Sequence, residues 1–503
     1  MRRRRDIVIS QSVETQNAIL RLNRARRVLA GIDDEGNETH PHQFSDEVIS
    51  FADGEGMRRP FPEVLVSGVQ ALLETQITSL EKYFFLTRFQ EFDQKIKEMF
   101  VSEGISEEIA SNICISTGTS HLFNAFFSSL KLKGDIILTA PGYYHSLANW
   151  CYLNNGILDI VNTKEENKYK ICENDLNNWM KINGKPPKVL VIFNPTYTGA
   201  FYTKDELNGI ANFVEKYNVR VVEDSLFMYT KYDDSLPIYH LAQYSNIKEN
   251  VITIHGASKS YGLANLRIGW ACGGTEIINK MNFYVGATQV DAPHVSKAMA
   301  LKALEGPVSY LDTNKKELLD RVKLITAHIE DINNFLAVTY NCNNDVIKIP
   351  YMPESGHSLL ISLDSLIGLE TEYGFRLNDS IDITKYFLLK AKVALSPGYS
   401  MGYTDGTMRI SFGCIGLKSS YESSVELEKF LILKESLKMN NLLNEFTERD
   451  DYIERNEREL LIGYHNKQEN AFLEGRTIII EGMGKLKHAI SQLLKFNCQS
   501  VQV

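Results

Sequence analysis

A lysine between small residues is the strongest sign of covalent chemistry in this sequence. Lys259 lies in the run 258–262, Ser-Lys-Ser-Tyr-Gly, directly after the β-rich stretch Val251–His255, and Arg267 and Gly269 follow it. A lysine at a strand end can approach a buried aldehyde, and its amine forms a Schiff base once it has lost its proton. Ser-Lys alone would suit a surface turn equally well. The arginine and glycine at this spacing favour the covalent role.

Two charged residues at other strand ends could bind the remaining parts of such a ligand. Asp224 follows the β-rich stretch Val219–Val222, where a carboxylate can pair with a protonated nitrogen. Arg409 lies within the strand-like run Met408–Phe412, and a guanidinium can bind a carboxylate with two parallel hydrogen bonds. Taken singly, the aspartate would suit a turn and the arginine a surface ion pair.

Three further motifs follow predicted strands and carry polar or aromatic groups. Gly118, Thr119 and Ser120 open a helix, and a glycine turn at a helix N-terminus can bind an anion. An isolated motif of this kind would more commonly be a simple N-cap. Tyr143 follows Pro-Gly after the strand predicted at Asp135–Thr139, and Asn194 begins an Asn-Pro-Thr-Tyr-Thr-Gly run.

Together and in this order, these motifs resemble those of the class I/II aminotransferases, which are fold type I enzymes that use pyridoxal 5′-phosphate (PLP). The resemblance extends from about Ile49 to Leu433. It implies that Lys259, with Ser258 beside it, carries PLP as a Schiff base and that Arg267 binds the cofactor phosphate. Asp224 is then the partner of the pyridine nitrogen, and Lys259 and Asp224 are the catalytic residues.

The same resemblance implies roles for the other motifs. The cofactor phosphate would bind at Gly118, Thr119 and Ser120, and Tyr143 would stack on the pyridine ring. Arg409 would bind the α-carboxylate of an amino-acid substrate, and Gly54 would lie in the substrate loop Phe51–Gly56. Tyr83 lies where the family places a tyrosine that reaches the phosphate in the partner subunit, so the resemblance implies a homodimer.

The sequence departs from the family pattern at three places. Gly256 replaces a serine that would bind the phosphate, and Phe227 replaces a tyrosine whose hydroxyl binds the O3′ oxygen of the cofactor. The loop that begins at Asn194 is shorter than in the family. We favour Asn194 slightly as the residue that binds O3′, with Thr196 or Tyr197 as the alternatives.

Strands that alternate with helices predict an α/β fold, of the PLP-dependent transferase fold type I in view of the resemblance. We expect a large PLP-binding domain with a mostly parallel central sheet over residues 49–300, of which 49–80 belong partly to the small domain. A smaller α/β C-terminal domain is expected over 301–435. Residues 1–48 would form an N-terminal arm, and 436–503 a mainly helical extension with one possible strand at Thr477–Glu481.

Composition limits the classes of partner. The 503 residues carry a net charge of −9, which argues against nucleic-acid binding, and no stretch is long and apolar enough for a membrane span. Seven widely spaced cysteines predict neither disulfides nor a zinc site, so we expect reduced thiols and a cytoplasmic location. His40-Pro41-His42 has no further ligands at metal spacing, and no metal is expected.

The predicted activity is transamination of an amino acid through the Schiff base on Lys259, with removal of the α-proton. The same site could instead support an elimination like that of aminocyclopropane-carboxylate synthases, or an amino-acid oxidation. A non-catalytic sensor on this fold is the least favoured alternative. The segment 285–294 contains Asp291 and no arginine, so a neutral or cationic substrate side chain is favoured over an acidic one.

Overall fold

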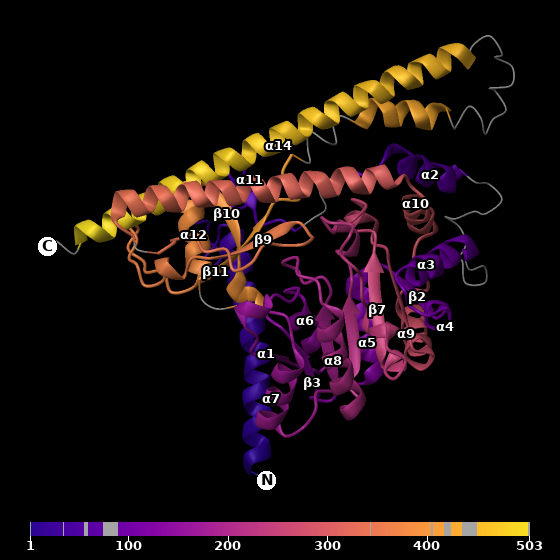
Figure 1. The fold of residues 1–503 in the computed structure, drawn as a ribbon, viewed down its shortest axis with the longest axis horizontal. Coiled ribbons are helices and arrows are strands. Elements are labelled where there is room, and N and C mark those ends of the chain that lie inside the picture. The colour runs from indigo at the N-terminus through magenta and orange to yellow at the C-terminus, as the bar shows by residue number, and fades with distance from the viewer. Residues whose placement is uncertain are drawn as a thin grey trace.

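Two β-sheets and the helices that cover them form the protein, seen here in a computed structural model (Figure 1). The structure describes residues 2–33, 35–54, 59–73, 89–342, 344–403, 406–416, 424–434 and 450–500. Within that part of the chain, no helix combines the length and apolar character that crossing a membrane requires.

The larger sheet has seven strands in the order β2-β8-β7-β6-β5-β3-β4. Its bounds are β2 Ile113–Ser116, β3 Ile136–Thr139, β4 Ile157–Ile160, β5 Val189–Phe193, β6 Arg220–Asp224, β7 Val251–Gly256 and β8 Gly269–Gly273. All neighbours pair in parallel except β8, which is antiparallel to both β2 and β7. Parallel strands end at one edge, so the segments after β5, β6 and β7 meet there.

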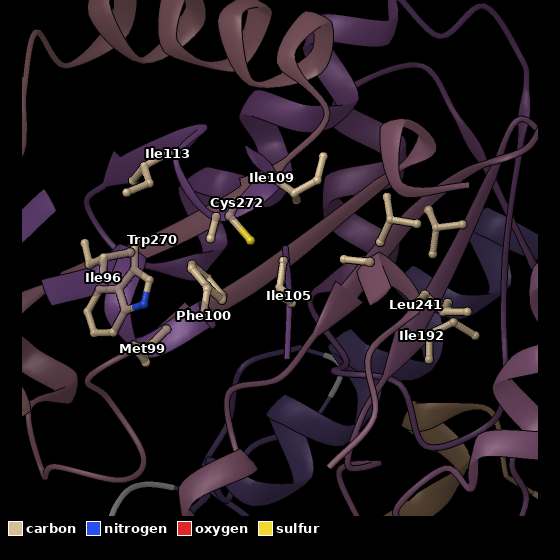
Figure 2. Close-up of a cluster of buried hydrophobic side chains, with 14 of the residues drawn as sticks. Ile96, Met99, Phe100, Ile105, Ile109, Ile113, Ile192, Leu241, Trp270 and Cys272 are labelled. Atoms are coloured by element: carbon tan, nitrogen blue, oxygen red, sulfur yellow. The ribbon is translucent and has the colours of Figure 1, made fainter. Parts of the chain in front are cut away.

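Apolar side chains cover both faces of this sheet. Figure 2 shows one face, where Trp270 of β8 meets Ile96 and Phe100 from α3 (Gln90–Ser102). On the other face, a separate buried cluster includes Phe123 and Phe126 of α5. The covering helices are α4 (Glu107–Ala110), α5 (Thr119–Leu130), α6 (Leu147–Leu153), α7 (Glu173–Asn183), α8 (Lys204–Tyr217), α9 (Thr275–Thr288) and α10 (His294–Leu304).

The smaller sheet has the order β1-β10-β11-β9. Its strands are β1 (Ile49–Phe51), β9 (Ser358–Ser362), β10 (Val393–Pro397) and β11 (Thr407–Ser411), and α11 (Val308–Tyr340), α12 (Ser380–Ala391) and α14 (Asp450–Ser500) cover it. In Figure 1 the yellow α14 runs alongside α11 over this sheet and continues beyond it, where it lies beside the helix at 424–434. β1 joins the smaller sheet although it comes early in the chain, because it pairs in parallel with β10.

The strand predicted at Thr477–Glu481 is wrong, because these residues lie inside α14. Ile479 is fully buried whereas Ile480 is 46% exposed, and Met483, Leu486 and Ile490 continue the buried stripe. That spacing is helical, so packing of one face against the small sheet overrides the β-propensity of the isoleucine run.

The first helix of the chain connects the two sheets. α1 (Arg2–Leu29) buries Ala18 in the core of the large sheet, and the Thr15 hydroxyl accepts a hydrogen bond from the Leu158 backbone nitrogen at 3.0 Å. Beside the small sheet, Arg24 of α1 pairs with Asp379, the N-cap of α12, and with Asp382 in its first turn. α2 (Pro62–Leu73) packs against α10. The predicted α/β fold is confirmed, and the bounds of the four domains stay a prediction.

Candidate active site

Lys259 lies where the two sheets meet. It follows the end of β7 by three residues, and its Nζ donates a hydrogen bond to the backbone carbonyl of Gly54, which lies just after β1 of the smaller sheet. Ser258 and Ser260 on either side are buried, and the Ser260 hydroxyl has no hydrogen-bond partner among the described residues. The lysine therefore reaches across the junction from a turn with an unsatisfied buried donor.

Asp224 is the last residue of β6, on the strand next to β7, and is 4% exposed. Burial raises the pKa of its carboxyl to about 6, against the hydrogen bond from the Leu226 nitrogen and the charges of His255 and Lys259, which lower it. The Leu226 nitrogen, at 3.0 Å, is the one hydrogen-bond donor that we find for this carboxylate within the described structure. Asp224 thus has spare acceptor capacity close to Lys259.

A tight junction of β2, α5 and β8 brings the predicted phosphate-binding residues together. Gly118 N-caps α5 with φ +90°, and a Cβ atom on it would lie 2.5 Å from a terminal nitrogen of Arg267. A Cβ atom on Gly269 would lie 2.8 Å from the Thr119 backbone nitrogen. These glycines let a guanidinium and the start of a helix, where Ser120 also lies, approach one another as an anion site requires.

The same junction explains the glycine at position 256. A Cβ atom there would lie 3.2 Å from the Thr119 methyl group and 3.3 Å from both the Ile268 carbonyl and a Leu226 methyl group. The Thr119 methyl group and its neighbours therefore crowd the space that a serine side chain would need. At the position where the family has a serine, this protein therefore has close packing around Gly256 and not an empty space.

Arg409 lies on β11 of the small sheet and is 7% exposed. Its Nη2 donates to the Ala52 carbonyl at 3.2 Å and to the Ser396 hydroxyl at 3.1 Å. A Cβ atom on Gly54 would lie 3.4 Å from the same nitrogen. Lys259 and Arg409 therefore meet at one loop, and Gly54 leaves room beside the guanidinium.

The loop after β3 contributes an aromatic ring and an imidazole. Tyr143 is 1% exposed, burial raises the pKa of its hydroxyl, and a Cβ atom on Gly402 would lie 2.9 Å from its ring. Burial, and then the charges of Arg409, Arg26 and Lys259, lower the pKa of His145 to about 3. His145 thus lies neutral among cations. We did not predict it, although it stands two residues beyond Tyr143.

Asn194 lies at the right strand end but uses its amide elsewhere. Its Nδ2 donates to Glu223 Oε1 at 2.9 Å and to the Tyr239 carbonyl at 2.8 Å, and its Oδ1 accepts from the Tyr202 nitrogen at 3.3 Å. Both amide hydrogens are therefore occupied on the Glu223 side of β6. These contacts do not support our slight preference for Asn194 as the donor to O3′.

Tyr197, one of the two alternatives, does approach the site. Its ring stacks on Tyr144 with centroids 5.3 Å apart and meets Phe227 edge-on at 5.1 Å. Burial, and then the negative charge of Asp224, raises the pKa of its hydroxyl, and Arg409 opposes this. Its hydroxyl thus lies near both Asp224 and Arg409. Tyr83, the predicted residue of the partner subunit, lies outside the described residues.

Comparison with known proteins identifies the family. Residues 47–419 match the family described as Aminotransferase class I and II. The chain belongs to this family. A probable aspartate/prephenate aminotransferase of Rickettsia prowazekii is 30% identical over 349 residues, which cover 67% of this chain and 82% of that protein. An aspartate aminotransferase of Bacillus sp. (strain YM-2) is 26% identical over 63% of this chain and 76% of its own length.

Solved structures of aminotransferases share the fold. An aspartate aminotransferase from Rhizobium meliloti superimposes with a TM-score of 0.64 at 22% identity and covers 73% of this chain and 87% of its own. An aromatic aminotransferase from Pyrococcus horikoshii has a TM-score of 0.63, also at 22% identity, over 80% of this chain and 98% of its own. The predicted fold, the assignment to an aminotransferase and the PLP cofactor are confirmed.

The residues at the junction of the sheets fit PLP. Lys259 offers the amine, buried Asp224 has acceptor capacity left for the ring nitrogen, and Gly118 lets Arg267 approach the start of α5, an arrangement that suits a phosphate. Tyr143 offers a buried aromatic ring. Each group lies on a different loop of the same sheet edge, which is where ligands bind in sheets of this type.

Proposed function

We propose that this aminotransferase accepts an amino acid with an acidic side chain. The observation that carries the proposal is the cationic surroundings of His145, where Arg409, Arg26 and Lys259 all act on one neutral imidazole. One of these cations suffices for an α-carboxylate, so a second carboxylate can be bound as well. Two relatives are named as aspartate and probable aspartate/prephenate aminotransferases, which agrees with this class.

Asp291 does not oppose an acidic substrate in the way that the sequence suggests. Its carboxylate pairs with Lys297 at 2.6 Å, and the lysine side chain is 7% exposed. A paired carboxylate presents little net charge to a substrate. Our preference for a neutral or cationic side chain rested on that charge and on the lack of an arginine in residues 285–294, and we replace it with the opposite proposal because other cations lie near His145.

We propose that Lys259, Asp224 and Arg409 share the chemical work. PLP, when bound, supplies an aldehyde and an electron-withdrawing ring that stabilises charge at the α-carbon of the amino acid. Lys259 holds the cofactor and, once displaced, removes the α-proton, because its amine then lies beside that carbon. Asp224 keeps the ring nitrogen protonated, and Arg409 orients the α-carboxylate.

Other residues bind the cofactor without taking part in proton transfer. We propose that Gly118, Thr119 and Ser120 at the start of α5, together with Arg267, bind the phosphate. Ser258 lies next to Lys259 and is 9% exposed, so we propose that its buried hydroxyl also lies near the phosphate. Tyr143 covers one face of the ring, and Gly54 leaves space for the substrate beside Arg409.

We also propose a homodimer in which Tyr83 reaches the phosphate of the partner subunit. The support is the family resemblance alone, and light scattering of active enzyme tests it, since a fully active monomer would contradict it. A cytoplasmic location is proposed as well, because none of the seven cysteines forms a disulfide.

A substrate panel tests the proposed function. Aspartate, phenylalanine and lysine are each offered with 2-oxoglutarate, and keto acid, ammonia and oxygen uptake are measured. We expect kcat/KM for aspartate to exceed that for lysine by about 100-fold, since an ion pair is gained in one case and a repulsion in the other. Arg26→Gln should reduce this ratio. A preference for lysine, or ammonia without glutamate formation, would contradict the proposal.

A further inference from the structure

Arg321 is a buried arginine that no step of the proposed chemistry uses. It lies on α11, is 2% exposed, and pairs through Nε with Glu317 at 2.9 Å. Its Nη1 donates to two backbone carbonyls, Phe412 at 2.7 Å and Ile415 at 2.8 Å. One guanidinium group thus binds a carboxylate on its own helix and two carbonyls on a distant segment.

The distant segment is the continuation of the strand that carries Arg409. Phe412 follows β11 directly, and the Cys414 thiol contacts the Asp53 carbonyl at 3.9 Å. The neighbouring backbone carbonyls of this loop also accept hydrogen bonds. The Ala52 carbonyl accepts one from Arg409, and the Gly54 carbonyl accepts one from Lys259. Three consecutive carbonyls of one loop therefore contact Arg409, the segment held by Arg321, and Lys259.

The C-terminal helix α14 completes this network from outside. Arg476 pairs with Glu317 and, at 3.1 Å, with Asp320, so it holds the same carboxylate that Arg321 binds. A Cβ atom on Gly475 would lie 2.5 Å from Arg321 Nη2 and 3.0 Å from the Ile415 carbonyl. Where α14 packs against α11 (Figure 1), Gly475 thus allows the backbone of α14 to approach the guanidinium of Arg321 closely.

An arginine at position 321 is better suited to fixing the position of its neighbours than to increasing the stability of the fold. Burying an ion pair costs desolvation, and an apolar contact of the same size is often as stable or more so. An arginine, however, fixes the direction of two carbonyls with one planar group. The surroundings are otherwise the apolar cluster under the small sheet, where Leu318, Val322 and Phe412 are buried.

We propose that Arg321 is a positioning residue for the carboxylate subsite, and that Arg476 of α14 supports it. Arg321 holds the segment after β11, and thereby sets where Arg409 lies relative to the loop at residues 52–54. The proposal rests on the proposed role of Arg409. It gives the C-terminal helix a function in substrate binding, although no residue of α14 is assigned to the site.

The test compares three variants of the full-length holoenzyme. Arg321→Lys keeps the charge beside Glu317 but cannot reach two carbonyls with a planar group. Arg476→Gln changes a residue whose side chain is 35% exposed, so folding is not at risk. Lys485→Gln is the matched control, because its ion pair with Glu481 at 2.8 Å lies on the same helix and touches neither Glu317 nor Asp320.

Measurements separate substrate binding from cofactor binding and turnover. We expect Arg321→Lys to raise KM for the amino acid, and the inhibition constant of succinate, by about tenfold, and Arg476→Gln to raise both about threefold. kcat should change less than about twofold, and the dissociation constant of PLP should not change, since the arginine acts on the carboxylate subsite alone. Lys485→Gln should match the unmodified enzyme in every measurement.

An Arg409→Lys variant separates failure of this proposal from failure of the proposed function. If Arg409→Lys does not weaken succinate binding, the assigned role of Arg409 is wrong. If it does, while Arg321→Lys and Arg476→Gln both bind succinate normally, Arg321 has a structural role only. Equal loss of kcat, PLP binding and succinate binding in both variants would overturn the proposal in the same way.

Discussion

Glu223 and Asp224 are consecutive residues of β6, yet their carboxylates have opposite surroundings. Glu223 is fully buried and accepts three hydrogen bonds at 2.9 Å, from Asn194 Nδ2, His240 Nδ1 and the Leu241 nitrogen. Asp224 faces the other side of the sheet and accepts one, from Leu226. The two carboxylates of one strand thus differ in the number of hydrogen bonds that they accept from the protein.

The difference fits our proposal that Glu223 is a structural acid and that Asp224 binds a ligand. Buried polar groups in proteins are normally satisfied, so a carboxylate with one protein donor indicates that a ligand supplies the rest. The Glu223 side continues as a closed network, in which Glu103 lies 3.1 Å from His240 and 3.2 Å from His255. The spacing of these three would also suit a metal ion, but their contacts already pair the charges.

The largest effect is expected on the Asp224 side of the sheet, at Lys259. Lys259→Ala should abolish the visible absorbance of the bound cofactor and the aminotransferase activity, while the circular dichroism spectrum stays unchanged. The reason is that, in the function we propose, the lysine amine makes the covalent link and moves the α-proton. Borohydride reduction followed by peptide mapping checks the assignment, and a pyridoxyl adduct on another lysine would refute it.

A pair of variants tests the comparison directly. Asp224→Asn should lower kcat/KM by about 100-fold or more and leave stability almost unchanged, because a ligand-directed charge is lost. Glu223→Gln should cost about 3 kcal/mol of unfolding free energy, since it leaves the imidazole of His240 without one of its buried partners. Urea denaturation and steady-state kinetics on both variants decide it. If both variants lose activity and stability to the same extent, the two carboxylates do not have the distinct roles proposed here.

The Glu223 side should also make stability depend on pH. Burial lowers the pKa of His240, but the carboxylates of Glu223 and Glu103 outweigh it and raise the pKa from 6.5 to about 10. A raised pKa means that this stabilisation is complete below about pH 6.5 and is lost as the pH rises through about 10.

His240→Gln provides the check on this dependence. Its unfolding free energy should be lower than that of the unmodified protein at pH 7, and the difference should shrink as the pH rises and vanish only above about pH 10, where the imidazolium of the unmodified protein is lost. Urea denaturation at a series of pH values measures this. A constant difference across the range would show that His240 is neutral in the folded protein.

The sequence was sufficient to place residues at the ends of strands, and the roles that we assign to them remain a proposal. Asp224 ends one parallel strand of the large sheet and Lys259 follows the next, and parallel topology brings such residues to one edge, whereas Arg409 lies on an antiparallel strand of the smaller sheet. The strands predicted at Val251–His255 and Asp135–Thr139 match β7 and β3 to within one residue, because each is a buried apolar segment with clear ends.

The direction of a side chain could not be predicted in the same way. Asn194 and Tyr197 stand in one short loop, and only the distant partners Glu223 and Tyr239 show that the asparagine turns away. The run at 477–481 has β-propensity, and only its packing on the small sheet makes it helical. The role that we propose for Arg321 could not be predicted from sequence, since two of its partners are backbone carbonyls about ninety residues away.

The smallest expected effect concerns the donors around the cofactor oxygen O3′. Phe227 lacks the hydroxyl that the family pattern has, and Asn194 uses its amide on Glu223. Tyr197 remains, with its ring against Phe227 and its hydroxyl near Asp224 and Arg409. With fewer donors, O3′ is more basic and holds the proton that it shares with the Lys259 linkage more tightly, which raises the pKa of that linkage.

Phe227→Tyr should therefore lower the pKa of the Lys259–cofactor linkage by about one unit, which corresponds to about 1.4 kcal/mol. Tyr197→Phe should raise it, because it removes the donor that we infer to be left. Spectrophotometric pH titration of the two variants and the unmodified enzyme measures all three values. If Phe227→Tyr has no effect while Tyr197→Phe raises the pKa, Tyr197 already occupies the place of the missing hydroxyl. If neither variant changes the pKa of the linkage, a residue of another loop donates to O3′, and the ring contact between Tyr197 and Phe227 serves packing alone.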